Sequence, residues 1–196
     1  MTERPILFSA PMIRALLAGT KTQTRRVAKP PFDLLFAGGA KPGMLARAPY
    51  GVAGDRLWVR ETWGFDSRVR HDFKPIGQHD LSGMDLLTHT LYRATTDDQP
   101  PRWRPAIHMP RWASRITLEV TEVRCQRLQE ISEDDARAEG VESANGHPEL
   151  GAIIGRGPSY REGFAQLWRT INGARPGCSW ADNPWLWCVS FRRITP

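Results

Sequence analysis

The chain has 196 residues, 40% of them hydrophobic and 24% charged, which is typical of a globular protein with one core. Three scattered Cys exclude a disulfide framework, and no pair of them has the spacing of a metal site. No apolar run approaches the roughly 18 residues of a membrane span, and the N-terminus lacks a signal-peptide apolar region. We therefore expect a cytoplasmic protein with a single domain over residues 1–196 and no membrane partner.

The formal net charge of +6 is carried by 23 Arg and only 4 Lys. Arg presents a planar fork of donors and stacks on flat rings, so this excess indicates phosphate or base contacts, although a GC-rich genome produces the same bias. Several of the eight Trp stand beside Arg, as in Trp58 to Arg60 and Trp112 after Arg111. Such rings suit base stacking, but burial in the core is an equally good interpretation.

The N-terminal part predicts a strand, a helix and a sharp stop. Residues 6–8 are apolar and suit a buried strand, after which Ser9 caps a helix with Pro11 in its first turn. Its apolar stripe ends at Gly19, which suits a left-handed residue that reverses the chain.

Residues 19–26 then bring three Thr and three cations together without an acid. Such a segment is suited to an anion or a polar ligand, and a solvated edge strand is the alternative interpretation. The residues of this segment that we consider as site candidates are Lys21, Thr22, Thr24, Arg25 and Arg26.

The middle of the chain contains two long aperiodic segments, residues 28–53 and 64–88, which we interpret as loops. Between them, residues 54–63 predict a turn and an alternating strand that carries Trp58, Arg60, Glu61 and Trp63, and residues 89–94 predict a further short strand. The five His share no metal-ligand spacing, so neither a metal nor a cofactor is expected.

The C-terminal half predicts a strand at 116–123, a helix after Ser132, a helix at 160–171 and a strand at 185–191. Ser132 and Asp135 have the spacing of a capping box, and Gly140 ends the helix directly after Glu139. A carboxylate at a helix C-terminus is either exposed or held by a cation such as Lys21. The whole pattern predicts an α+β fold, with a small, mostly antiparallel β-barrel and short flanking helices.

Four segments together resemble the ASCH domain of the PUA-like superfamily: residues 19–26, residues 54–59, the strand 117–121 and residues 136–140. The first is similar to the family's Gly-x-Lys-x-x-x-x-Arg signature and the last to its Ala-x-x-Glu-Gly signature. The resemblance implies a PUA-like β-barrel with a cleft, a setting associated with RNA and modified nucleosides.

One branch of this family, the small N4-acetylcytidine amidohydrolases, uses a Lys, a Thr and a Glu in catalysis. The resemblance places these roles on Lys21, Thr24 and Glu139. In a regular strand, positions 21 and 24 point to opposite faces, so they converge only if Lys21 lies in the turn after Gly19 or a bulge intervenes. Those enzymes are about half as long, and nothing in them matches residues 64–110, which we interpret as an insertion. The longer architecture looks more like ASCH-related proteins of bacteriophages and prophages.

Three functions remain open from the sequence. The first is binding of RNA, DNA or a modified nucleoside; the second is hydrolysis of an N4-acylated cytidine; the third is a structural or regulatory phage role with a vestigial cleft. For the first, Arg25 and Arg26 would hold phosphate, and Trp residues would stack an unpaired base. The ligand-binding candidates are Thr22, Arg25, Arg26, Trp58, Arg60, Glu61, Trp63 and Trp112.

Overall fold

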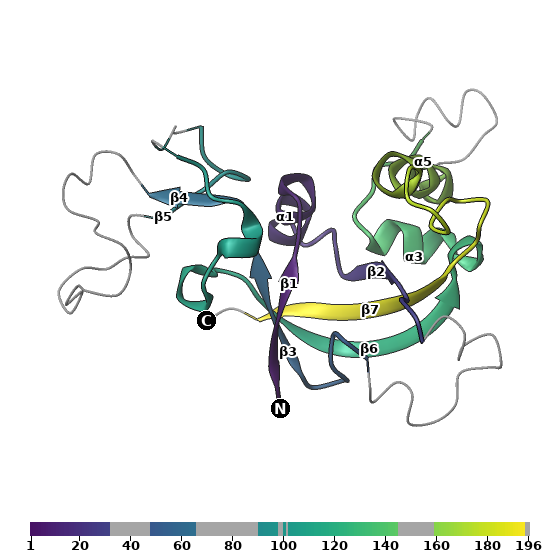
Figure 1. Cartoon of the computed structure of the whole chain (residues 1–196), viewed down its shortest axis with the longest axis horizontal. Coiled ribbons are helices and arrows are strands. Elements are labelled where there is room, and N and C mark those ends of the chain that lie inside the picture. The colour runs from purple at the N-terminus through teal and green to yellow at the C-terminus, as the bar shows by residue number, and fades with distance from the viewer. Residues whose placement is uncertain (32–47, 66–89, 98–99, 101, 145–158, 195–196) are drawn as a thin grey trace.

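The computed structural model describes residues 1–31, 48–65, 90–97, 100, 102–144 and 159–194. These residues form a mixed α+β structure in which a sheet makes the core and a few helices cover it (Figure 1). The strands are β1 (Glu3–Leu7), β2 (Gln23–Val27), β3 (Arg56–Arg60), β4 (Trp63–Phe65), β5 (Thr90–Tyr92), β6 (Thr117–Arg127) and β7 (Trp185–Ile194). The helices are α1 (Ala10–Leu17), α3 (Glu133–Ala138) and α5 (Tyr160–Asn172), with the 3-10 turns η2 (Ala106–His108), η3 (Arg111–Ala113) and η4 (Leu128–Glu130).

The main sheet has the strand order β1-β3-β6-β7-β2, in which β1 pairs parallel with β3 and the other pairs are antiparallel. Within the described residues β1 and β2 are edge strands, and no pairing closes the sheet, so the closed barrel expected from the sequence is not observed. Helix α1 connects the two edge strands, and its buried residues Ile13 and Leu16 pack on the sheet. The apolar face is therefore covered by a helix where a barrel would cover it by closure.

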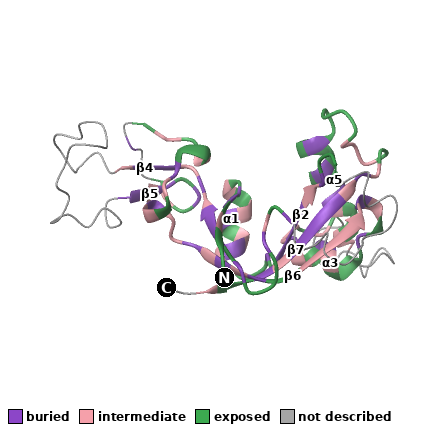
Figure 2. Cartoon of the chain, turned by 60° about the horizontal axis from the view of Figure 1, so that its bottom comes forward, coloured by how far each residue is buried: buried purple, intermediate pink, exposed green. Residues whose placement is uncertain are grey.

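Helices cover both faces of β7, because its side chains alternate between the faces. Val189 and Phe191 pack in one apolar cluster with α1, whereas Leu186 and Cys188 pack in another with residues of α3 and α5. Figure 2 shows the resulting band of buried residues along β7 between its neighbours β2 and β6. One helical layer is α1, and the other consists of α3 and α5. The two layers meet at the edge strand β2, next to the turn that follows α1.

The turn that leads into β2 has the predicted construction. Gly19 follows the end of α1 with a φ of 76°, and the N–H groups of Gly19 and Thr20 donate to the last turn of the helix. The hydroxyl of Ser132 accepts a hydrogen bond from the N–H of Asp135 and so caps α3. The predictions for Gly19 and Ser132 are confirmed, as are the long strand β6 and the helix α5. Ser9 stands at the N-cap of α1, but its side chain makes no capping hydrogen bond.

The other end of the molecule is formed by β4 and β5, which make a separate two-stranded sheet, and by η2 and η3 (Figure 1). Of these elements, β5 and η2 lie within residues 64–110, which we interpreted as an insertion, whereas β4 begins just before it and η3 follows it. Most of the two predicted loops, 28–53 and 64–88, lies outside the described residues. None of the helices in the described ranges has the length and apolarity that crossing a membrane requires.

Candidate functional site

Lys21 and Glu139 form a buried ion pair at the junction of the two helical layers. The ammonium Nζ of Lys21 lies 2.7 Å from Oε2 of Glu139 and donates a second hydrogen bond, 2.8 Å long, to the backbone oxygen of the same residue. Only 1% of the Lys21 side chain and 5% of the Glu139 side chain are exposed. The two residues also form an isolated antiparallel bridge. The turn after Gly19 and the C-terminus of α3 are therefore joined by backbone and side chains alike.

Gly140 makes this close approach possible. Its φ is 74°, in the left-handed region that suits glycine, and it follows the end of α3 directly. A Cβ atom at this position would lie 2.9 Å from Cβ of Lys21 and 3.0 Å from Cβ of Ala15. The Glu-Gly pair therefore supplies a carboxylate and the space that Lys21 needs to reach it.

A second cation, Arg25, extends the pair into a network. Its Nη1 lies 3.3 Å from Oε1 of Glu139, and its Nη2 lies 2.9 Å from Oδ2 of Asp135. Each carboxylate oxygen of Asp135 also accepts a hydrogen bond of 2.7 Å from Arg124. One of these oxygens accepts a further hydrogen bond, 3.1 Å long, from the side-chain amide of Gln23. Strand β2, helix α3 and strand β6 are thus tied together by charged side chains.

The environment shifts the ionisation of this network. Burial lowers the pKa of Lys21, and the attraction of Glu139 offsets part of that change. For Asp135, burial acts to raise the pKa, but hydrogen bonds from Arg124 and Gln23 and the charge of Arg25 bring it below its usual value. An ammonium that gives up its proton more easily than usual, in contact with a carboxylate, is a pair suited to proton transfer.

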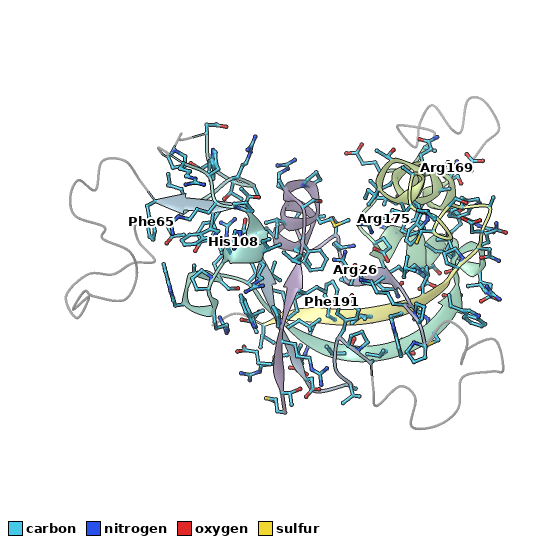
Figure 3. The ribbon with its side chains drawn as sticks, viewed as in Figure 1. Arg26, Phe65, His108, Arg169, Arg175 and Phe191 are labelled. Atoms are coloured by element: carbon cyan, nitrogen blue, oxygen red, sulfur yellow. The ribbon has the colours of Figure 1, made fainter. Side chains whose placement is uncertain are left out.

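Thr24 and Arg26 lie on the other face of β2. Thr24 pairs across the strands with Val189, in the α1 layer, and is 1% exposed. In the described part of the chain, no hydrogen bond joins its hydroxyl to Lys21 or Glu139. Arg26 lies 5.3 Å from the ring centre of Phe8 and donates to the backbone oxygen of Leu7. Phe8 in turn packs against Phe191, and Figure 3 labels Arg26 and Phe191 on this side of the molecule. The role of Thr24 stays a prediction.

A cleft of about 1320 Å³ opens between α1, α3 and α5, next to the ion pair. Thr22 reaches it from the turn, and neither Lys21 nor Glu139 is part of its wall. The wall contains two cations, Arg14 and Arg137, and two acids, Asp134 and Glu142. Its other residues are uncharged and include small, polar, aliphatic and aromatic side chains: Pro11, Ala15, Ala18, Gly19, Thr20, Ala138, Gly140, Val141, Ser143, Ala144, Tyr160, Gly163, Gln166, Leu167 and Thr170.

The predicted tryptophans and Glu61 do not lie at this cleft. Trp63 is 1% exposed and packs with Trp112 in a cluster beside β4, so its ring is covered in this structure. Trp58 is also buried, with the guanidinium of Arg60 at 4.7 Å from its ring centre. Glu61 accepts two hydrogen bonds from Arg115, and burial raises its pKa despite this contact. The sequence candidates therefore divide between two places.

Sequence reasoning missed Asp135, Gln23 and Gln126 as partners of Arg25, and it missed Arg124 as a partner of Asp135. Asp135 was interpreted only as a capping residue, and the charged positions of β6 only as an alternating face. The sole available signal was that Arg25 and Gln23 lie on the same face of a strand. Among the described residues, no group of three His, Cys, Asp or Glu side chains is placed to hold a metal ion.

No protein-family model matches the chain, and no curated protein matches it significantly. Among solved structures, it is similar to protein EF3133 of Enterococcus faecalis V583, from the family DUF984, with 11% identity and a TM-score of 0.42 over 99% of this chain and 80% of that one. It is also similar to an ASCH domain from Lactobacillus crispatus JV V101, with 13% identity and a TM-score of 0.36 over 98% of this chain and 79% of that one. Similarity at this level assigns neither a family nor an activity.

Proposed function

We propose that the chain binds an unpaired nucleotide of RNA, or a modified nucleoside, in the cleft between α1, α3 and α5. The observation that carries the proposal is the cleft itself, bordered by the turn that holds the buried Lys21–Glu139 pair. The resemblance of residues 19–26 and 136–140 to ASCH signatures supports the same ligand class, because both segments border the cleft.

The wall of the cleft offers what a nucleoside requires. A nucleoside presents a flat ring and hydrogen-bonding edges, which proteins recognise by stacking and by polar side chains. Tyr160 supplies a ring, with the guanidinium of Arg137 at 5.8 Å from its centre. Hydroxyls of Thr20 and Thr22 and the amide of Gln166 supply polar edges. The cleft is larger than the ~300–1,000 Å³ of an ordinary small-molecule pocket, so it has room for one nucleotide together with part of the strand that carries it.

Helix α5 offers a matched pair of variants for the test. Leu167 and Ile171 are both exposed apolar residues of this helix, one turn apart, but only Leu167 borders the cleft. Leu167→Glu places a carboxylate in the cleft, and Ile171→Glu places the same charge outside it. We expect Leu167→Glu to weaken binding of a labelled single-stranded RNA by about tenfold or more, measured by fluorescence anisotropy, because a like charge opposes the phosphate. Equal affinities of the two variants and the wild type would reject the cleft as the site.

Amide hydrolysis is a second candidate, favoured by the contact between Lys21 and Glu139. In N4-acetylcytidine, water would add to the acyl carbon, the C–N bond would break, and acetate and the free 4-amino group would form. Lys21, in its neutral form, would take the proton of the attacking water and hand it to Glu139, which would pass it to the leaving amine. Because both side chains are nearly excluded from solvent, the substrate has to reach them past Thr22 from the cleft.

Acetate release from N4-acetylcytidine tests this candidate. We expect Lys21→Ala and Glu139→Gln each to lower turnover by about 100-fold or more, as loss of a general acid or base does. Glu119→Gln serves as control, since Glu119 is ion-paired to Arg192 on the exposed part of the sheet. If neither Lys21→Ala nor Glu139→Gln changed the turnover, the two proposed roles would be rejected. If the protein bound RNA but released no acetate, binding would remain as the function and hydrolysis would be rejected.

A further inference from the structure

Arginines and aromatic rings gather at the end of the molecule built by β4, β5 and residues 102–104. The guanidinium of Arg93 lies 5.9 Å from the ring centre of Trp103. That of Arg104 lies 5.1 Å from the ring of Trp63 and 5.2 Å from the ring of Phe65. Figure 3 shows Phe65 at this end and Arg169, a residue of α5, at the opposite end.

The backbone fixes the arrangement. Trp63 and Arg104 exchange two hydrogen bonds, of 2.8 and 3.2 Å, so that Arg104 continues the small sheet beyond β4. The N–H of Arg93 donates to the oxygen of Thr62 at the start of β4. At Gly64 a Cβ atom would lie 3.2 Å from the backbone oxygen of Arg102, which shows how closely this segment crosses the strand. The side chains therefore project from an ordered support.

Among the described residues at this end of the molecule, cations outnumber acids. In the described residues between 60 and 115 there are six arginines, and Glu61 and Asp97 are the only acids. Glu61 is ion-paired with Arg115, and Arg111 is ion-paired with Glu3. The segment 93–104 contains three arginines, Arg93, Arg102 and Arg104. None of them takes part in an ion pair between described residues. Arg93 and Arg102 are exposed.

We propose that this surface, defined by Arg93, Arg102, Trp103 and Arg104, binds single-stranded nucleic acid. Exposed guanidinium groups contact phosphates, and the partly exposed ring of Trp103 stacks an unpaired base. A duplex hides the faces of its bases, so the ligand is a single strand. This inference goes beyond the proposed function, since the surface shares no residue with the cleft between α1, α3 and α5.

The test measures binding of a labelled single-stranded oligonucleotide, as RNA and as DNA, and of the matching duplex, over a range of salt concentrations. The double variant Arg93→Gln, Arg102→Gln is expected to lower the slope of log K against log salt by roughly 1.4, about 0.7 for each lost phosphate contact. Arg111→Gln is the matched control, because Arg111 is exposed in the same segment but held by Glu3. It is expected to leave the slope unchanged.

Trp103→Ala is expected to weaken single-strand binding by about 5- to 150-fold, and Trp103→Phe to retain most of it, as stacking requires. Thermal unfolding confirms that each variant is folded. An unchanged salt slope in the double variant, or equal binding of the duplex, overturns the proposal. Loss of binding in Leu167→Glu with no effect of Arg93→Gln, Arg102→Gln would assign nucleic-acid binding to the cleft alone and also overturn it.

Discussion

The ammonium of Lys21 lies 2.7 Å from a carboxylate oxygen of Glu139, although 118 residues separate the two in the chain. Lys21 follows the turn that ends α1, and Glu139 ends α3, so the contact joins the two helical layers at the edge of the sheet. Because both side chains are almost fully buried, each charge depends on the other for compensation. Single substitutions of Lys21 or Glu139 therefore test how much the pair contributes to stability.

Removing one partner of the pair is expected to destabilise the fold strongly. Glu139→Gln leaves the Lys21 ammonium buried without its carboxylate, which costs about 3–5 kcal/mol when a buried ion pair is broken. The double variant Lys21→Met, Glu139→Gln is expected to lose less than the sum of the two single variants, because no unpaired charge remains. Urea unfolding measures each free energy of unfolding.

An exposed pair supplies the control for this prediction. Arg192 and Glu119 lie 2.9 Å apart, with 67% and 26% of their side chains exposed. Exposed ion pairs contribute about 0–1 kcal/mol, so Glu119→Gln is expected to have little effect. Equal losses from Glu139→Gln and Glu119→Gln would contradict the view that burial makes the first pair essential.

Gly140 is expected to be less tolerant of a side chain than Gly177, which is also left-handed but has open space around it. Gly140→Ala brings a Cβ atom to 2.9 Å from that of Lys21, in addition to the strain of a φ of 74°. Gly177 has a φ of 69° but nothing within 4 Å of its would-be Cβ, so Gly177→Ala isolates the backbone strain. We expect about 1–2 kcal/mol for Gly177→Ala and a further ~1–3 kcal/mol for Gly140→Ala, measured by denaturant unfolding. Similar losses at both positions would argue against a tight contact with Lys21.

The sequence allowed this junction to be anticipated because local signals defined both of its ends. Gly19 ended one helix and Gly140 ended another, and a carboxylate at a helix C-terminus calls for a cation. From the sequence, Glu139 is either exposed or held by a cation such as Lys21, and the ion pair agrees with the second alternative. In the predicted strand 116–123 the apolar residues Ile116, Leu118 and Val120 alternate with polar ones, and the structure buries all three.

Other features depended on which elements meet in space, and no local pattern reports this. The partners of Asp135 come from β2 and β6, as far as 112 residues away in the chain. Trp63 was a candidate for ligand binding, but its backbone pairs with that of Arg104 and its ring is buried beneath the guanidinium of that residue. The parallel pairing of β1 with β3 also has no sequence signal of its own, because either strand direction accepts the same apolar run.

The thiol of Cys188 is expected to make the fold less stable as the pH rises through the alkaline range. Burial raises its pKa from an ordinary value of 9.0 to about 11, with the charges of Arg25 and Arg124 acting in the opposite direction. Between these pH values the unfolded thiol loses its proton while the folded one keeps it, so the free energy of unfolding falls as the pH rises. The loss amounts to at most about 1.4 kcal/mol per pH unit.

A comparison of slopes isolates the contribution of Cys188. Lys21 acts with the opposite sign, because its pKa is lowered by folding, but it is present in both the wild type and Cys188→Ala. We therefore expect the wild type to lose stability more steeply than Cys188→Ala between about pH 9 and 11, measured by urea unfolding at a series of pH values. Parallel curves would show that Cys188 does not keep its proton in the folded chain.

Asp135 is expected to control stability at acid pH, since hydrogen bonds from Arg124 and Gln23 and the charge of Arg25 outweigh burial and lower its pKa. A carboxylate of this kind stabilises the fold above its unfolded pKa, and the contribution disappears as the pH falls through its lower folded pKa. Asp135→Asn should therefore lower stability at neutral pH and flatten the decline on acidification. Glu122→Gln removes the other carboxylate bound to Arg124, but that side chain is 57% exposed, so it should change neither quantity much. If Asp135→Asn and Glu122→Gln gave the same acid unfolding curve, the contacts of Asp135 with Arg25 and Arg124 would not stabilise the fold. The ion pair of Lys21 and Glu139 would then be the part of the network that matters for stability.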